Sequence, residues 1–319
     1  MIFIEMMSPK GHIRLNEFYL EALWEPGDRL ILGESLQGSY TDFSPILFRD
    51  RFGNFISRIY SAIAALRLIP IGSKREICFL SYDLLLMPAV VALLRLRGWR
   101  VFAFEHNTTP NSPMKRSFHR AIGKEVCHFS YAPYVSDRFS NLGLKVRTIS
   151  HPILTSPKEA SGAGPEVALV LSRSGEFENV VFCPSASVSW EQIEPLATSR
   201  PRTLFVVKSN AKVNAKNVLS FPFFEEYLEI LAICDAVYIP FSRDDKVSGP
   251  FFEALGAGKI VVVKDNVFGR YAKSEFACQV RFEDEEWSQS SCHVKVDLIS
   301  HNLGIIADLR AVLRGMSGS

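Results

Sequence analysis

Residues 248–253 combine a hydroxyl, a glycine backbone, a proline and a carboxylate where a strand-like run gives way to a helix. Pro250 suits the first helical position, whose amide hydrogen has no partner within a helix. Ser248 and Gly249 precede it, so the first amides of the helix are left open to a ligand. Those amides and the helix dipole favour an anion such as a diphosphate. The segment therefore predicts a phosphate-binding site at this helix start.

Charged side chains stand on both sides of this helix start. Arg243 and Lys246 lie in the polar loop before it and are expected to offset charge on a departing diphosphate without a metal ion. Glu253 lies one turn into the helix, where its carboxylate can accept hydrogen bonds from ribose hydroxyls. The adjacent Asp244 and Asp245 do not form the DxD arrangement of a metal site, so no metal ligands are predicted. The alternative is an ordinary strand-loop-helix segment that binds no ligand, in which the serine caps the helix and the glutamate is solvated.

Two short segments in the first half carry further reactive side chains. Gly11 and His12 follow the first strand-like run; the glycine lets the backbone approach a substrate closely, and the histidine can serve as a base or a sugar ligand. Glu105 and His106 follow a second run at 101–104, and ligands of open α/β sheets collect at such carboxyl ends. We take His106 as the first candidate for a reactive residue. Glu105 is the second, either as a buried general base or as the partner of a neighbouring arginine.

Short apolar runs alternate with amphipathic stretches along the chain, which predicts an α/β fold with mostly parallel sheets. A Ser/Gly/Pro cluster at 155–165 separates two such series, so we expect domains at 1–154 and 165–319. Strands are expected over 2–7, 30–33, 77–81, 101–105, 128–131, 146–150, 180–183, 204–207, 218–221, 236–240, 260–263 and 278–282. Helices are expected over 14–23, 54–66, 86–97, 113–124, 133–142, 191–196, 224–233, 250–255 and 301–314.

The composition is that of a globular protein, with 47% of the 319 residues hydrophobic and 22% charged. The six cysteines are scattered without a CxxC pair, which favours reduced core residues in a cytoplasmic protein over a zinc site. The apolar run at 84–94 has 11 residues, well short of the roughly 20 that cross a bilayer. We therefore expect the chain to touch a membrane surface at most.

Charge is divided unevenly along the chain. Residues 1–154 carry 19 Lys and Arg against 13 Asp and Glu, whereas the remainder carries 17 against 21. Basic and aromatic residues alternate at 49–60 and 115–120, which favours contact with anionic lipid headgroups on the inner face of a membrane. The alternative is a pair of ordinary helices with solvated arginines. Nucleic acid is disfavoured because the basic residues are dispersed and the acidic second half would repel a polyanion.

The segment 227–264 resembles the donor-binding region of GT-B glycosyltransferases, especially those of family 4. In that pattern a strand ends in Pro-Ser or Pro-Tyr, a glycine-containing helix start follows, and a Glu precedes Ala-Leu/Met-Ala-x-Gly-x-Pro-Val. The corresponding run in this chain is Ala-Leu-Gly-Ala-Gly at 254–258. The family pattern has two Glu residues eight positions apart; the second matches Glu253, and Asp245 stands in the first position. The resemblance implies ribose binding for Glu253 and a donor-sugar contact for Asp245.

The resemblance covers nearly the whole chain and implies two Rossmann-like domains facing a cleft, with a C-terminal helix that is able to pack back on the first domain. The first domain would bind the acceptor and the second the nucleotide sugar. Family 4 enzymes often place a histidine that contacts the donor sugar where His106 stands. The basic pair usual in the family is not cleanly present, and Lys208, Lys212 or Arg243 is its candidate replacement.

We therefore expect a metal-independent glycosyltransferase that needs no cofactor beyond its nucleoside-diphosphate sugar donor. The acceptor would be a hydroxyl of a glycan or a lipid-linked sugar, as in bacterial-type surface polysaccharide or glycolipid assembly. Retention of configuration requires no dedicated base, whereas inversion would assign that role to Glu105, His12 or Asp42. Two alternatives stay open: a sugar-nucleotide epimerase and a non-catalytic sugar-nucleotide-binding subunit.

Overall fold

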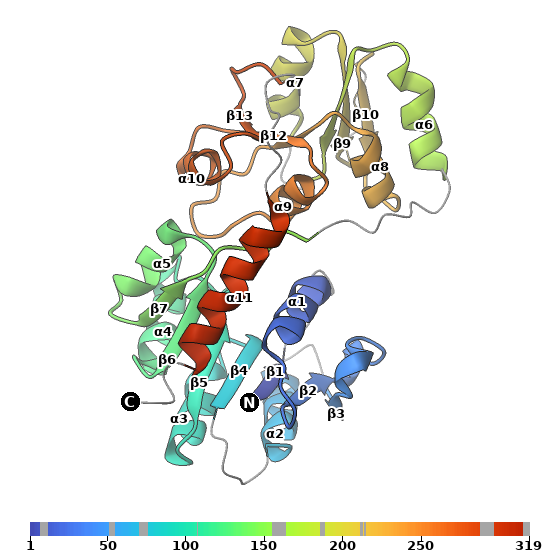
Figure 1. Cartoon of the computed structure of the whole chain (residues 1–319). Coiled ribbons are helices and arrows are strands. Elements are labelled where there is room, and N and C mark those ends of the chain that lie inside the picture. The colour runs from blue at the N-terminus through green and yellow to red at the C-terminus, as the bar shows by residue number, and fades with distance from the viewer. Residues whose placement is uncertain are drawn as a thin grey trace. The chain divides into compact units, whose positions relative to one another are not determined.

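The computed structural model describes residues 1–6, 12–50, 55–69, 76–106, 108–154, 164–185, 189–210, 213, 215–287 and 297–314 (Figure 1). These residues form two compact units, one of Met1–Pro152 with Leu303–Ser319 and one of Ile153–Asn302. The second unit thus ends before the chain does, unlike the block 165–319 expected from the sequence. The last helix, α11 (Leu298–Arg314), passes into the first unit, where the guanidinium Nε of Arg310 donates to the carbonyl of Ala22 at 2.9 Å.

Among its described residues, the first unit holds a sheet of seven parallel strands in the order β3-β2-β1-β4-β5-β6-β7. The strands are β1 (Ile2–Glu5), β2 (Arg29–Gly33), β3 (Ile46–Phe48), β4 (Glu76–Ser81), β5 (Arg100–Phe104), β6 (Val126–Ser130) and β7 (Lys145–Thr148). The helices are α1 (Ile13–Leu23), α2 (Phe55–Arg67), α3 (Met87–Leu96), α4 (Pro113–Ile122) and α5 (Pro133–Ser140).

Both faces of the first sheet are covered, which explains why its inner strands are continuous apolar runs. On one face, side chains of β5 such as Val101 share a hydrophobic cluster with α2, α3 and α4. On the other, Phe104 at the end of β5 stacks on Tyr19 of α1 with ring centroids 4.2 Å apart. Because β1, β4, β5 and β6 are parallel, their carboxyl ends lie at one edge of the sheet. The strand order reverses between β1 and β4, and ligands of such sheets bind at this edge beside the reversal.

The second unit repeats this plan with six described parallel strands in the order β10-β9-β8-β11-β12-β13. The strands are β8 (Asn179–Cys183), β9 (Thr203–Lys208), β10 (Val218–Phe221), β11 (Ala236–Ile239), β12 (Ile260–Val263) and β13 (Val280–Phe282). The helices are α6 (Pro165–Ser174), α7 (Trp190–Ser199), α8 (Tyr227–Ile233), α9 (Gly249–Gly256) and α10 (Val267–Glu275).

The expected α/β fold with a parallel sheet in each half is confirmed. Among the described strands and α-helices, three were not expected from the sequence: β3, α6 and α10. Here β3 is a three-residue strand at the edge of its sheet, too short for a periodic signal. The start of α10 does have a local signal, because the side chain of Asn266 accepts a hydrogen bond from the amide of Gly269 at 2.8 Å, as an N-cap asparagine does.

Candidate functional site

The predicted phosphate site lies where the chain passes from β11 to α9, at the point where strand order reverses in the second sheet. Ser248 is the N-cap of α9, with extended backbone angles, and Pro250 lies in the first turn. The Ser248 side chain is buried and makes no capping hydrogen bond to the helix. Ser248 therefore gives the first amides of α9 no side-chain cap, which favours an anion there, while the amide of Phe251 donates to the carbonyl of Ser248 at 3.2 Å.

Gly249 leaves open space at this helix start. A methyl group built on it would have no heavy atom within 4 Å, and its backbone does not have the positive φ that favours glycine. Neither packing nor backbone conformation therefore requires a glycine here. Close approach of a ligand to the backbone would require one.

We expect Gly249→Ala to leave the free energy of unfolding unchanged or slightly higher, because alanine favours helices and the added methyl meets nothing. We expect it to weaken nucleoside-diphosphate binding about 10-fold or more, a loss of about 1.4 kcal/mol, because the methyl intrudes on the phosphate. Urea unfolding and calorimetric titration with a nucleoside diphosphate measure the two effects. Gly175→Ala is the matched control, since a methyl there also meets nothing within 4 Å. Unchanged binding in Gly249→Ala would contradict the site.

Two of the predicted charged residues form an ion pair in the loop before α9. The guanidinium of Arg243 donates from Nε and Nη2 to the two carboxylate oxygens of Asp245, at 2.8 and 2.7 Å. Asp245 is buried whereas about half of the Arg243 side chain is exposed. The hydrogen bonds that Arg243 donates to Asp245 raise the pKa of Arg243, so its guanidinium stays charged. Lys246 follows it, half-buried.

Glu253 is held by a residue that sequence reasoning missed. The hydroxyl of Tyr227, at the start of α8, donates to Oε2 of Glu253 at 2.6 Å. Burial, and then the charge of Glu253, raise the pKa of Tyr227, which keeps the hydroxyl protonated and able to donate. The bond fixes the direction of the carboxylate. No local signal could have revealed this contact, because the two residues lie 26 positions apart.

Lys208 ends β9 at the same edge of the second sheet, and its ammonium lies 4.9 Å from the ring centroid of Phe223. Phe223 itself is 63% exposed. The structure thus places Lys208 on a strand separated from β11 by β8, with an exposed aromatic ring beside it.

In the first unit, His106 lies in a cluster of rings at the carboxyl edge of the sheet. Its ring centroid is 4.3 Å from that of His12 and 5.5 Å from that of Tyr131, whose hydroxyl lies 3.3 Å from Nδ1 of His106. The ring of His151 also packs against Tyr131, with centroids 5.1 Å apart. Burial, followed by the neighbouring His12 and His151, lowers the pKa of His106 well below its usual range. His106 is therefore a neutral imidazole near pH 7. Gly11 lies outside the described residues.

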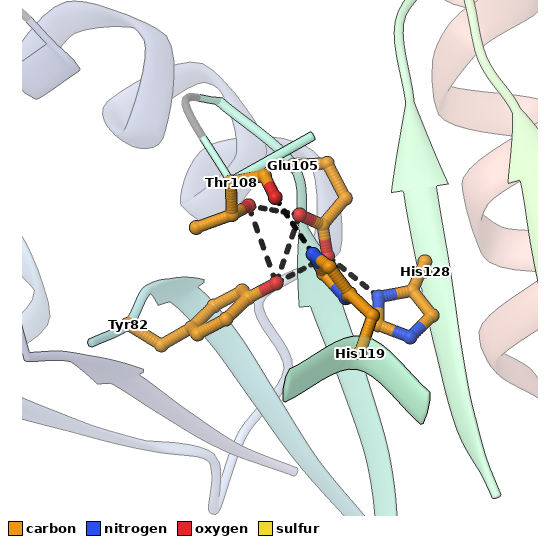
Figure 2. A network of polar contacts seen from close by, with 5 residues as sticks. All are labelled: Tyr82, Glu105, Thr108, His119 and His128. Carbon is orange, nitrogen blue, oxygen red and sulfur yellow. Dashed lines mark hydrogen bonds and ion pairs between the residues drawn. The ribbon is translucent and has the colours of Figure 1, made fainter. Parts of the chain in front are cut away.

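Glu105 has hydroxyl and imidazole partners rather than the arginine that the sequence allowed. Its carboxylate contacts Tyr82, Thr108 and His128, and its side chain is fully buried (Figure 2). Burial by itself raises the pKa of Glu105. The charge and hydrogen bond of His128, together with weaker contacts, outweigh burial and lower the pKa overall. The group is therefore an enclosed carboxylate, and a substrate hydroxyl has no direct access to it in this structure.

A second buried carboxylate, missed by sequence reasoning, is Glu5 at the carboxyl end of β1. Its Oε2 accepts hydrogen bonds from the hydroxyl of Tyr40 at 3.0 Å and the side-chain amide of Asn16 at 2.9 Å. The Ser81 hydroxyl lies 3.5 Å from Oε1, at the distance limit of a hydrogen bond. Burial raises the pKa of Glu5 to about 7, although its three hydrogen bonds lower it. The signal in the sequence was a single acid inside an apolar strand.

The raised pKa of Glu5 predicts that folding stability falls as pH rises. The folded protein binds the proton of the Glu5 carboxyl more tightly than the unfolded chain does, where the reference pKa is 4.5. The stabilisation from this proton is therefore complete below pH 4.5 and is lost as the pH rises through 7. The loss is about 3 kcal/mol by linkage. Glu5→Gln should remove most of this slope and be the more stable protein at pH 8, as measured by urea unfolding. Glu34→Gln, at an exposed position, is the control and should keep the wild-type slope. A slope unchanged by Glu5→Gln would contradict the assignment.

Within the described ranges, no three His, Cys, Asp or Glu side chains are grouped as a metal site. None of the helices within those ranges has the length and apolar character that a bilayer crossing requires.

The fold is shared with known enzymes, although no protein-family model and no curated protein sequence matches the chain. HepE of Anabaena in complex with UDP-glucose is 13% identical with a TM-score of 0.60, over 97% of this chain and 99% of that one. A glycosyltransferase of Rickettsia africae is 11% identical with a TM-score of 0.68, over 100% and 98%. A putative UDP-N-acetylglucosamine 2-epimerase of Listeria monocytogenes is 11% identical with a TM-score of 0.58, over 100% and 97%. The chain therefore has the GT-B fold of two Rossmann-like units.

Proposed function

We propose that the chain is a family 4-type glycosyltransferase that moves a hexose-like sugar from a nucleoside-diphosphate donor to a hydroxyl of a glycan or lipid-linked acceptor. The observation that carries the proposal is the start of α9, where Gly249 leaves open space beside the first helical amides and Ser248 provides no side-chain cap. The UDP-glucose complex of HepE, a protein of the same fold, supports a nucleotide sugar as the ligand.

The second unit would bind the donor. In this proposal the amides at the start of α9, together with Lys246, Arg243 and Lys208, offset the charge that grows on the departing diphosphate, so that no metal ion is needed. Glu253, fixed by Tyr227, accepts hydrogen bonds from the ribose hydroxyls. The carboxylate of Asp245 contacts the donor sugar, and its pair with Arg243 holds it in place for that contact.

The first unit would bind the acceptor and meet the donor sugar at its histidine cluster. A neutral His106 can both donate and accept hydrogen bonds, as recognition of sugar hydroxyls requires. His12, whose ring centroid lies 4.3 Å from that of His106, would serve as a second sugar ligand or as a base, and Gly11 would allow close approach of the substrate.

The test is to incubate the protein with sugar nucleotides, with and without added acceptors, and to measure release of nucleoside diphosphate and conversion of the donor. The acceptors used would be free hexoses and a polyprenyl-diphosphate-linked sugar. A transferase releases diphosphate faster when an acceptor is present. Conversion of the donor to an epimer without an acceptor would replace the proposal with an epimerase, and donor binding without turnover would replace it with a binding subunit.

We further propose that the helical face of α2, α3 and α4 rests on anionic lipid. The three helices pack on one core cluster and contain six basic residues and no acidic one. Arg58 pairs with Asp83 and Arg95 with Glu125. Large apolar side chains are exposed on the same helices: Phe55, Ile56, Tyr60, Ile63, Leu93, Leu96 and Met114. Apolar side chains among cations match the surface of an anionic bilayer.

This membrane proposal predicts that the protein floats with phosphatidylglycerol-containing vesicles and less with pure phosphatidylcholine ones. The double substitution Ile56→Ser and Tyr60→Ser should reduce binding to the anionic vesicles without lowering stability, because both side chains are more than 60% exposed. Leu169→Ser, at an exposed position on α6 of the second unit, is the control and should bind as the wild type does. A wild-type protein that stays unbound would contradict the proposal.

A further inference from the structure

A buried polar network joins Tyr82, Glu105, Thr108, His119 and His128 (Figure 2), and two of its members, Glu105 and Thr108, flank His106 in the sequence. Three groups donate to the carboxylate of Glu105. The Tyr82 hydroxyl lies 2.6 and 2.8 Å from its two oxygens, the Thr108 hydroxyl donates to Oε2, and Nδ1 of His128 donates to Oε1 at 2.6 Å. Neither Glu105 nor His128 exposes any of its side chain. Both carboxylate oxygens are therefore occupied and shielded from a substrate.

The same network anchors the chain on either side of His106. Before it, the amide of Glu105 donates to the carbonyl of Phe129 at 2.9 Å, which extends the pairing of β5 with β6. After it, Thr108 is held through its hydroxyl by Glu105 and through its carbonyl by Nε2 of His119, at 2.6 Å. A carbonyl only accepts hydrogen bonds, so Nε2 of His119 carries the hydrogen. Burial lowers the pKa of His119, which is consistent with a neutral imidazole in this tautomer.

We propose that Glu105 is a positioning residue which, through Thr108, fixes His106 for contact with the donor sugar, and that Glu105 is not the general base of the reaction. The proposal rests on the proposed function for the role of His106, but the positioning itself is a structural claim that can be tested alone. A general base needs an oxygen within reach of the substrate hydroxyl, and both oxygens of Glu105 face protein donors instead.

A purely structural role would predict something different. If the network only stabilised the core, removing one of its hydrogen bonds would lower the melting temperature and leave the His106 ring where it is. Ser136 supplies the comparison, because its buried hydroxyl also bonds to two hydroxyls of the first unit, those of Ser130 and Thr148. Ser136→Ala therefore removes a similar buried contact away from the His106 segment.

The experiment records nitrogen-15 spectra of histidine-labelled protein, with the His106 signals assigned by their loss in His106→Gln. Thr108→Val removes the hydroxyl and keeps the shape; we expect it to shift the His106 ring signals, and Thr108→Ser to restore them. Ser136→Ala should leave them unchanged. His106 signals that stay in place in both Thr108→Val and a folded Glu105→Gln would overturn the proposal, whether or not the protein proves to be a transferase.

Kinetics provide the second readout. With an active enzyme, Thr108→Val and Glu105→Gln should lower kcat about 10- to 100-fold, as small misplacements of reactive groups do, with a smaller change in donor KM. The pH profile of the residual activity of Glu105→Gln should keep the wild-type shape. Loss of one limb of that profile would identify Glu105 as the base and overturn the proposal. Absence of any transfer by the wild type would reject the proposed function, and the spectra would still decide the positioning.

Discussion

Glu253→Ala is expected to weaken donor binding about 30- to 100-fold, because hydrogen bonds to a charged group contribute roughly 2–3 kcal/mol. The carboxylate is in place before the ligand arrives, since Tyr227 donates to Oε2 at 2.6 Å and cannot ionise near neutral pH. Little ordering is then needed when the ribose hydroxyls bind. Calorimetric titration with nucleoside diphosphates measures the loss without requiring an acceptor.

Two variants separate the ribose contact from a general effect on the second unit. Tyr227→Phe keeps the ring and removes only the bond that orients Glu253, so a smaller loss of about 3- to 10-fold is expected, near 1 kcal/mol. Glu275→Ala removes an exposed carboxylate at the end of α10 and should leave binding unchanged. If Glu253→Ala binds nucleoside diphosphates as tightly as the wild type, the ribose assignment is wrong.

The second large effect is expected from His106→Ala, which should lower turnover about 100-fold with little change in nucleoside-diphosphate affinity. A fixed hydrogen-bonding group that acts on the transition state typically raises kcat by about 100-fold or more. The affinity for nucleoside diphosphate should change little, because the proposed diphosphate site is in the second unit. Because the pKa of His106 is well below its usual range, this residue should add no pH dependence between pH 6 and 8. Steady-state kinetics at several pH values measure both.

The control for His106→Ala is His301→Ala, since His301 packs on Phe276 in the second unit, with ring centroids 5.7 Å apart. It removes an imidazole that has no part in the proposed reaction, and turnover should stay at the wild-type level. Full turnover in His106→Ala would mean that the reactive centre lies elsewhere.

The start of α9 could be predicted from the sequence because its signals are local. Pro250 in the first turn, Ser248 before it and the apolar strand β11 lie within fifteen residues, and each limits the backbone directly. The alternation of strands and helices likewise predicted both parallel sheets. By contrast, α6 follows the Ser/Gly/Pro cluster so closely that its proline reads as part of the linker, although Val167 and Val170 are buried at helical spacing.

The partners of the candidate residues could not be predicted, because they come together only in the folded sheet. Glu105 was expected to act as a base or to pair with an arginine, yet its contacts come from Tyr82 after β4, Thr108 in its own loop and His128 in β6. Parallel strands bring their carboxyl ends to one edge whatever their separation in sequence. The pattern therefore locates the edge of the sheet, and only the structure shows which side chains meet there.

The central claim is that a nucleoside diphosphate binds at the start of α9, and a thermal-shift panel of UDP, GDP, CMP and ADP sugars tests it most directly. A ligand at 100 times its Kd stabilises a protein by about 2.7 kcal/mol, which raises Tm by several degrees. We predict such a rise for one of the three diphosphate classes, UDP, GDP or ADP sugars, in the wild type and in Gly175→Ala, and a much smaller one in Gly249→Ala and Glu253→Ala; a rise with the CMP sugar alone, which carries one phosphate, would also contradict the claim. No rise with any of the four, or an equal rise in all four proteins, would contradict the claim.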